Sequence, residues 1–139
     1  IYGRSINKML EAYVKKMSKN IKLFDSLGSL YYLSLMQYVD AVVGNSSSGI
    51  VEAPSFKIGT INIGDRQEGR AQADSIINTK SSKESIRAAF KELYSNSFQE
   101  KLKNTKNLYG DGQAAQKITD KLKKYEYRDV LKKKFYKIL

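Results

Sequence analysis

The sequence predicts an α/β fold in which a parallel sheet is flanked by helices. Short apolar runs that end in glycine or polar residues alternate with longer stretches whose apolar residues recur every three to four positions. Three of the runs are predicted to be strands: Ala41–Val43, Thr60–Ile63 and Ser75–Thr79. Strands that alternate with helices pair in parallel, because each helix returns the chain across one face of the sheet.

Three further elements are predicted before the first of these strands: a helix over Tyr2–Lys19, a strand over Ile21–Phe24 and a helix over Ser29–Tyr38. A chain that opens on a helix feeding a strand is expected to lack a preceding segment. The second helix is expected to pack on the sheet through its apolar side chains Leu30, Leu33, Met36 and Tyr38.

Helices are also predicted after the last strand. The first begins near Lys80–Ser82, whose two serines are the candidate N-caps. Two more cover Asn96–Lys106 and Gly112–Lys124, with Asp111 as a candidate cap of the latter. The apolar stripe of the first helix is Ile86, Ala89, Phe90 and Leu93.

Length and composition fit one core. The chain has 139 residues, of which 41% are hydrophobic, and typical domains are of this size. It contains no cysteine, which excludes disulfides and cysteine-based metal sites, and no histidine, the usual acid/base group near neutral pH. No apolar run is long enough to span a bilayer and no signal-peptide pattern opens the chain, so a cytoplasmic location is expected.

The charge of the chain is +11, from 25 Lys and Arg against 14 Asp and Glu. Such a surplus can indicate nucleic acid or a membrane surface. No nucleic-acid motif accompanies the positive charge, so a solvated surface that also attracts pyrophosphate is favoured. Neither a nucleic acid nor a membrane is expected as a partner. The tail Tyr125–Leu139 is rich in lysine and keeps an apolar side, which predicts a basic helix; a membrane-surface or partner helix is the alternative.

Residues 40–70 carry the functional signal. Their first strand ends in Gly44, and Asn45 and three serines lead through Gly49 into a short helix, which Pro54 is expected to bend or shorten. The first N–H groups of a helix lack intrahelical partners and its macrodipole favours negative charge, so such a turn suits an anion. The alternative is that a serine simply caps the helix, which is worth about 1 kcal/mol.

Three residues near the serines favour anion binding over simple helix capping: Glu52, Arg66 and Arg70. The carboxylate lies one turn into the helix and the arginines follow the next strand. Ligands bind at the carboxyl ends of strands in open α/β sheets. A hydroxyl-bearing anion such as a nucleotide is therefore favoured. The alternative for the arginines is an ion pair with Asp65 or Glu68.

Longer motifs in this stretch resemble the signature of one enzyme family. They are Gly44-Asn45-Ser46-Ser47-Ser48-Gly49-Ile50, Glu52-Ala53-Pro54-Ser55, and Asn62-Ile63-Gly64-Asp65-Arg66-Gln67 with Gly69-Arg70. Together they resemble the hydrolysing UDP-N-acetylglucosamine 2-epimerases, and the likeness extends from Tyr2 to Lys124. Those enzymes make N-acetylmannosamine, or a related 2,4-diacetamido sugar, for sialic-acid-type pathways. The resemblance implies a UDP-sugar substrate and no cofactor.

The resemblance also implies a domain organisation. Members of the family are two-domain GT-B proteins, and 139 residues are too few for both domains. The chain is expected to be part of the C-terminal half: a partial Rossmann-like UDP-binding domain over residues 1–124 and a basic helix or tail over residues 125–139. The N-terminal domain of the same enzyme, absent from this chain, is the expected partner, and a homo-oligomer is a further expectation.

Site residues follow from the same motifs: the resemblance places UDP on Ser46, Ser47, Ser48, Gly49, Glu52, Arg66 and Phe24. The serines, with the amides of Ser48 and Gly49, would hold the pyrophosphate, and Arg66 would offer its planar fork to phosphate oxygens. Glu52, one helical turn past Ser48, would accept hydrogen bonds from both ribose hydroxyls. The loop of Phe24 would contact the base; the alternative is that this side chain is core. No metal site is expected.

In the resembling enzymes UDP leaves by elimination across carbons 1 and 2, and water then adds to the glycal-like intermediate. The free sugar, inverted at carbon 2, is released. The catalytic base is not assignable from this chain, because Asp65, Glu68 and Asp74 have only their location to recommend them. The chain alone is therefore expected to be catalytically inactive and to bind UDP weakly.

Three alternatives stay open. Non-hydrolysing epimerases, which return the UDP-linked epimer, carry an Asp-Ser-Gly-Gly type loop and a doubled Glu, where this chain has Asn45–Gly49 and the single Glu52. The others are half of a GT-B glycosyltransferase and a basic nucleic-acid-binding domain.

Overall fold

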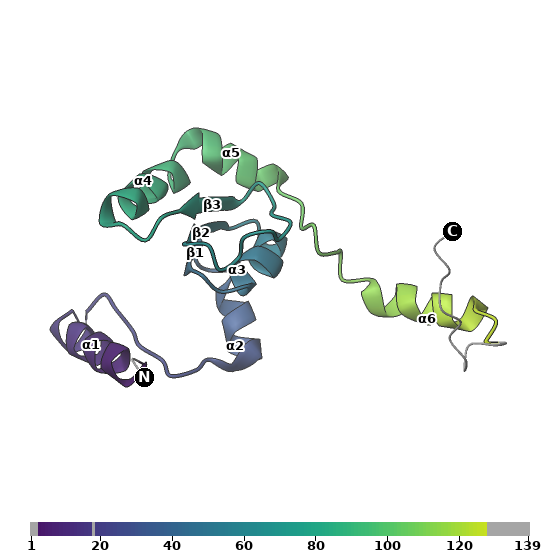
Figure 1. Cartoon of the computed structure of the whole chain (residues 1–139), viewed down its shortest axis with the longest axis horizontal. Coiled ribbons are helices and arrows are strands. Elements are labelled where there is room, and N and C mark those ends of the chain that lie inside the picture. Colours follow the sequence, from purple (N-terminus) through teal and green to yellow (C-terminus); the bar gives the residue numbers. More distant parts are fainter. Residues whose placement is uncertain (1–2, 18, 128–139) are drawn as a thin grey trace, which may run out of the picture. The chain divides into compact units, whose positions relative to one another are not determined.

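Figure 1 shows the chain as a computed structural model, in which residues 3–17 and 19–127 are described. The chain forms two compact units, Ile1–Val39 and Asp40–Leu139. The predicted division at residues 124 and 125 stays a prediction. Residues 125–127 are not helical, and the rest of the predicted tail helix lies outside the described residues.

The first unit contains two helices, α1 (Gly3–Lys16) and α2 (Gly28–Leu35). Both were predicted, and each is a few residues shorter than expected; residues 2 and 18 of the first prediction lie outside the described residues. The predicted strand over Ile21–Phe24 is wrong. These residues pair with none of the described strands, and an extended segment without a neighbour has no hydrogen-bond ladder to stabilise it.

The apolar side chains in and after α2 are mostly uncovered. Met36 is buried, whereas Leu30, Leu33 and Tyr38 are exposed, so the packing predicted for these three is wrong. The helix has apolar residues on all of its sides, and a single neighbouring surface cannot cover all of them.

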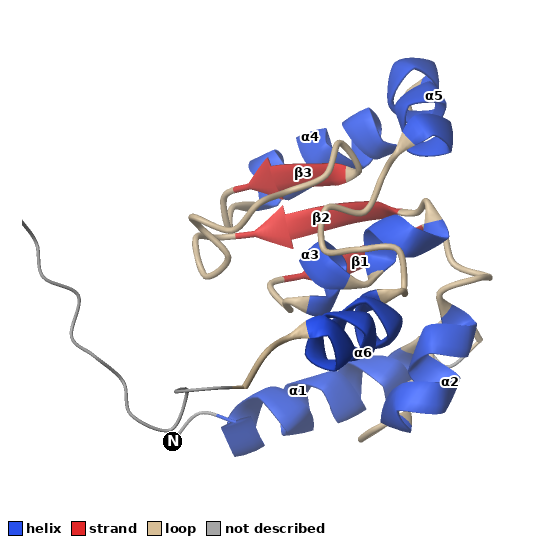
Figure 2. Ribbon diagram, turned by 90° about the vertical axis from the view of Figure 1, so that its right-hand side faces the viewer, coloured by secondary structure: helices blue, strands red, loops and turns tan. Residues whose placement is uncertain are grey.

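The second unit is built on a sheet of three parallel strands in the order β1-β2-β3 (Figure 2). The strands are β1 (Ala41–Gly44), β2 (Gly59–Ile63) and β3 (Ile76–Thr79). In the register Val43 lies beside Ile61, which lies beside Ile77. The predicted α/β class with a parallel, Rossmann-like sheet is confirmed, and the loops that follow the strands lie at one edge.

Helices cover both faces of this sheet (Figure 1). On one face, α4 (Lys83–Leu93) and α5 (Asn96–Asn104) close a core of six buried side chains: Ile61, Ile77, Ala89, Leu93, Phe98 and Leu102. On the other face, α3 (Ser48–Val51) lies against Thr60. Alternation of side chains along β2 produces this division, because neighbouring strand residues point to opposite faces.

The start of α4 is as predicted. The Oγ of Ser82 accepts a hydrogen bond from the backbone N–H of Ser85 at 3.2 Å, so Ser82 is the N-cap. Ala89 and Leu93 are buried, but Phe90 is 38% exposed, so its place in the stripe is wrong. Successive helix residues point about 100° apart, which turns Phe90 away from the face that Ala89 and Leu93 share.

The last described helix is α6 (Ala114–Lys124), which has no buried residue. Asp111 stands before it, and its Oδ1 accepts from the backbone N–H of Gln113 at 3.1 Å. This bond, and next the ammonium group of Lys117, hold the pKa of the Asp111 carboxyl below its usual value. The N-cap of α6 is Gln113, so the prediction that Asp111 caps this helix is wrong: Asp111 binds the backbone N–H of the cap residue and none in the first turn.

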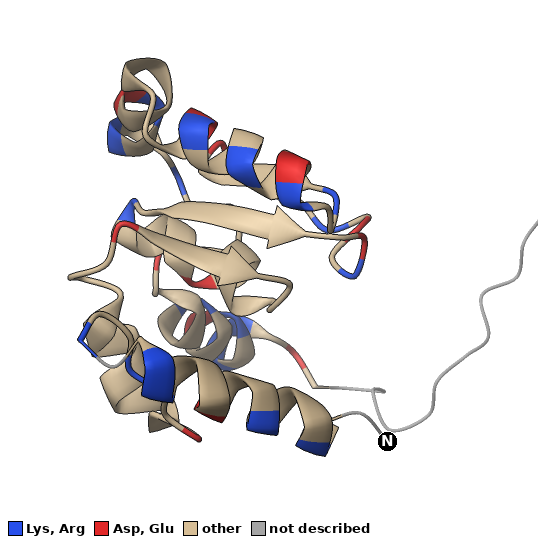
Figure 3. Cartoon of the chain, turned by 90° about the vertical axis from the view of Figure 1, so that its left-hand side faces the viewer, with Lys and Arg blue, Asp and Glu red and all other residues tan. Residues whose placement is uncertain are grey.

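Lysine and arginine are spread along the helices and loops, as Figure 3 shows. Each of them is exposed within the described part of the chain, in keeping with a solvated basic surface. None of the described helices is long and apolar enough to cross a membrane.

Candidate functional site

The loop after β1 has the predicted path from strand to helix. The strand ends at Gly44 with φ at +148°, and α3 begins at Ser48. Ser46 and Ser47 are exposed, and the Ser47 side chain makes no capping bond to the helix. Instead the amides of Ser48 and Gly49 donate to the side-chain and backbone oxygens of Ser46, at 3.3 Å each. These distances are at the long end of the hydrogen-bond range.

Gly49 lets α3 lie directly on the sheet. The Oγ1 of Thr60 donates to the Gly49 carbonyl at 2.8 Å, and both residues are buried. A Cβ atom at Gly49 would lie 2.6 Å from the Cγ2 of Thr60, which is inside van der Waals contact. Glycine at this position therefore lets α3 and the serine loop (residues 45–49) lie close to β2.

Glu52 follows the last residue of α3 and donates its N–H to the Ser48 carbonyl at 2.9 Å, one turn deeper as predicted. Its carboxylate is half-buried, and Oε2 is buried without a hydrogen-bond partner in the described structure. An unpaired buried acceptor costs about 1–3 kcal/mol, and more when it is charged. The helix gives way here to the 3₁₀ turn η1 (Ala53–Phe56), which contains Pro54, so the predicted shortening by proline is confirmed.

The loop after β2, the arginine loop (residues 64–71), carries Arg66 on the surface and Gln67 in the interior. Within the described residues, neither Arg66 nor Arg70 forms an ion pair, so the predicted alternative of pairing with Asp65 or Glu68 is not found. Gln67 is only 3% exposed. Its Nε2 donates to the Asn45 carbonyl at 2.8 Å, while its Oε1 is buried and has no hydrogen-bond partner among the described residues. The arginine loop is thereby tied to the serine loop.

A segment after α5 braces the same two loops. Asn107 donates through Nδ2 to the Val51 carbonyl at 2.8 Å and to the Ser55 Oγ at 2.6 Å. The hydroxyl of Tyr109 donates to the Ala71 carbonyl at 3.0 Å. Asn107 therefore fixes the joint between α3 and η1 at which Glu52 sits, and Tyr109 fixes the end of the arginine loop.

Replacing Asn107 by alanine is expected to lower the free energy of unfolding by about 1–3 kcal/mol, because it removes three side-chain hydrogen bonds and leaves a partly buried carbonyl unpaired. Urea denaturation of the 139-residue chain measures this change. Asn104→Ala is the control, since its side chain makes one long, exposed bond at 3.4 Å within its own helix. Equal stability of the two variants would contradict the bracing role of Asn107.

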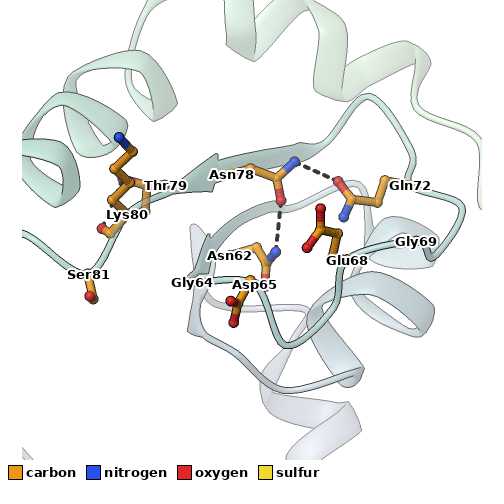
Figure 4. A pocket seen from close by; sticks show the side chains of 10 residues that line it. All are labelled: Asn62, Gly64, Asp65, Glu68, Gly69, Gln72, Asn78, Thr79, Lys80 and Ser81. Atoms are coloured by element: carbon orange, nitrogen blue, oxygen red, sulfur yellow. Dashed lines mark hydrogen bonds between the residues drawn. The ribbon is translucent and has the colours of Figure 1, made fainter.

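A pocket of about 760 Å³ opens beside the arginine loop, past the ends of β2 and β3 (Figure 4). Three amides run along it: Asn62 Nδ2 donates to Asn78 Oδ1 at 2.8 Å, and Asn78 Nδ2 donates to Gln72 Oε1 at 2.7 Å. The predicted phosphate- and ribose-binding residues do not line it. Its lining consists of Asn62, Gly64, Asp65, Glu68, Gly69, Gln72, Asn78, Thr79, Lys80 and Ser81.

The predicted site residues thus fall into two groups. The second unit holds Ser46, Ser47, Ser48, Gly49, Glu52 and Arg66 on two adjoining loops. Phe24 belongs to the first unit, where its side chain is 60% exposed rather than core. Sequence reasoning missed Gln67, although it lies inside a quoted motif, and Asn107, for which the sequence gives no local signal.

Comparison with known proteins agrees with the motifs. Residues 2–123 match the family model of UDP-N-acetylglucosamine 2-epimerase. A GDP/UDP-N,N'-diacetylbacillosamine 2-epimerase (hydrolyzing) from Campylobacter jejuni is 48% identical over 98 residues, which are 70% of this chain and 25% of that protein. The polysialic acid biosynthesis protein P7 of Escherichia coli is 41% identical over 80 residues, 56% of this chain and 20% of that protein.

A third relative, the UDP-N,N'-diacetylbacillosamine 2-epimerase (hydrolyzing) of Legionella pneumophila, is 28% identical over 121 residues, 87% of this chain and 30% of that protein. The chain therefore spans less than a third of the length of each of these relatives. The family model covers well over half of the chain. The chain belongs to the UDP-N-acetylglucosamine 2-epimerase family.

Proposed function

We propose that this chain is the UDP-binding part of a hydrolysing 2-epimerase that acts on a UDP-linked 2-acetamido sugar. The observation that carries the proposal is the 48% identity to a relative named as a hydrolysing 2-epimerase. Two of the relatives are named for N,N'-diacetylbacillosamine, so the UDP-2,4-diacetamido sugar is the first substrate to test and UDP-N-acetylglucosamine the second.

The serine loop, Arg66 and Glu52 suit the two parts of a nucleoside diphosphate, with the phosphates on the serine loop and Arg66 and the ribose on Glu52. The amides of Ser48 and Gly49 donate to Ser46 at 3.3 Å, and phosphate oxygens can replace these long bonds. The guanidinium of Arg66, which forms no ion pair within the described residues, adds a planar donor fork. The half-buried carboxylate of Glu52 matches the hydroxyls of a ribose, which are donors to an acceptor-only group. The geometry therefore supports phosphates at the serines and ribose toward Glu52.

In the proposed reaction the bond from carbon 1 to the UDP oxygen breaks, and the proton on carbon 2 leaves to a base. A double bond forms between carbons 1 and 2, and water then adds across it with inversion at carbon 2. Negative charge grows on the departing diphosphate, and one well-placed donor is worth about 3 kcal/mol in such a step. The serine loop and Arg66 supply those donors. We propose that the acid and base come from an N-terminal domain of the same enzyme.

The test is a chimera in which this chain replaces the matching segment of the Campylobacter relative. With the UDP-diacetamido sugar in D₂O, we expect one UDP and one free sugar per turnover, with deuterium at carbon 2. The unmodified relative is the positive control. A UDP-linked epimer as product would establish a non-hydrolysing isomerase instead. Transfer of the sugar to an acceptor would establish a glycosyltransferase, and the 139-residue chain alone is expected to give no turnover.

A further inference from the structure

One buried side chain joins the two loops of the candidate site. Gln67 donates to the Asn45 carbonyl at 2.8 Å across 22 positions of sequence, and only 3% of its surface is exposed. Asn45 immediately precedes Ser46, and Gln67 immediately follows Arg66. The bond therefore fixes the distance between the first serine of one loop and the arginine of the other.

The backbone around Gln67 passes this constraint on to Arg66. The N–H of Glu68 donates to the Asp65 carbonyl at 2.8 Å, and the N–H of Arg70 donates to the Gln67 carbonyl at 3.3 Å. Arg66 thus lies inside a hydrogen-bonded turn whose next residue is anchored in the interior. Its side chain is exposed and carries no ion pair in the described structure, so the position of its backbone decides where the guanidinium can reach.

Glutamine at position 67 is not the residue that would give the most stable fold. Its Oε1 is buried without a partner in the described part of the chain, which is unfavourable for a polar atom. Methionine has similar length and would fill the space without burying an unpaired oxygen. The amide is therefore explained by what its N–H group does, which is to hold the Asn45 carbonyl and through it the serine loop.

We propose that Gln67 is a positioning residue for the diphosphate: it sets the spacing between the serine loop and Arg66 that both phosphates require. The proposal rests on the proposed function of the site. Gln67 is too deeply buried to contact UDP, so it acts through the two loops that it joins.

The test compares UDP with uridine, which lacks the phosphates. Dissociation constants are measured by protein-observed NMR on the 139-residue chain and as inhibition constants on the chimera. For Gln67→Met we expect UDP to bind about tenfold more weakly, a loss of one hydrogen-bonded constraint, while uridine binds unchanged. Gln67→Leu, whose smaller apolar side chain also cannot donate to Asn45, is expected to behave the same way if the methionine variant does not fold.

Gln99→Met is the matched control. The Nε2 of Gln99 also donates to a backbone carbonyl, that of Leu93 at 2.7 Å, but on the far helix α5. This variant should bind both ligands as the unmodified chain does. Arg66→Ala should cost less affinity for UDP in the Gln67→Met background than alone, because Arg66 is already displaced.

Unchanged UDP affinity in Gln67→Met, or equal weakening of UDP and uridine, would overturn the positioning role. A wrong assignment of the proposed function would give a different result. In that case neither the unmodified chain nor the chimera binds UDP at millimolar concentration, and the positioning role falls with the site.

Discussion

Glu52→Ala is expected to weaken UDP binding about 100-fold without loss of the fold. A hydrogen bond to a charged group contributes about 1.5–3 kcal/mol, and the proposed ribose contact makes two. One carboxylate oxygen of Glu52 is buried without a partner in the structure as described, so removing the group relieves an unfavourable burial. The thermal midpoint should therefore stay the same or rise while the affinity falls. Titration of the chimera with UDP measures the affinity, and thermal unfolding of the same sample measures the midpoint.

Two further variants make the Glu52 experiment specific. Glu52→Gln keeps the shape and one acceptor, so a loss of about tenfold is expected. Glu100→Ala removes the same charge from an exposed position on α5, where it pairs with Lys103, and should leave UDP affinity unchanged. Because the proposed contact is to ribose, the Glu52→Ala variant should bind uridine more weakly as well as UDP. Wild-type affinity for both ligands in that variant would disprove the ribose contact.

The contrast between the two sets of variants locates the two ends of the nucleotide. Substitution of Glu52 should lower the affinities for uridine and UDP alike, whereas substitution of Gln67 should lower the affinity for UDP alone. The serine loop joins Gln67 to Glu52, because it begins beside Asn45 and ends at the turn of helix that carries Glu52. Comparing the loss of UDP affinity with the loss of uridine affinity in each variant therefore tests the orientation of the ligand as well as its presence.

Local sequence patterns were sufficient to predict the frame of the second unit. Each of the three strands is a short apolar run that stops at a glycine or polar residue, and Ser82 lies at the N-cap that its place before an apolar stripe indicates. The path from β1 through the serines into α3 follows from the same rules. These features depend on residues within a few positions of one another, so sequence alone contains the information.

The features that sequence reasoning missed depend on contacts between distant segments. The expected strand at Ile21–Phe24 has the right composition, but no neighbouring strand pairs with it in the described structure. Gln67 and Asn107 are polar residues whose roles come from carbonyls at Asn45 and Val51, 22 and 56 positions away. No periodicity or local propensity encodes such a bond, and it becomes visible only when the loops are placed together.

Gly59→Ala is expected to lower the free energy of unfolding by about 3 kcal/mol, the upper end of the range for overpacking a core. A Cβ atom there would lie 2.2 Å from the Cδ1 of Leu93 and 3.2 Å from the Cε1 of Phe98. Leu93 has no exposed surface and is enclosed by the core cluster, so it cannot swing aside into solvent. Either β2 or α4 must shift. Urea denaturation of the chain, with the slope checked for constancy, measures the loss.

The cause of that loss can be isolated with Leu93. Leu93→Ala alone should cost about 2–5 kcal/mol through the cavity that it leaves. In the double variant the new methyl group at Gly59 enters that cavity, so the combined loss should fall short of the sum of the two by about 1–3 kcal/mol. Gly3→Ala, where an added Cβ meets no atom within 4 Å, should change stability by no more than about 0.5 kcal/mol. Strict additivity at Gly59 and Leu93 would mean that the glycine is required for its backbone and not for the approach of α4 to the sheet.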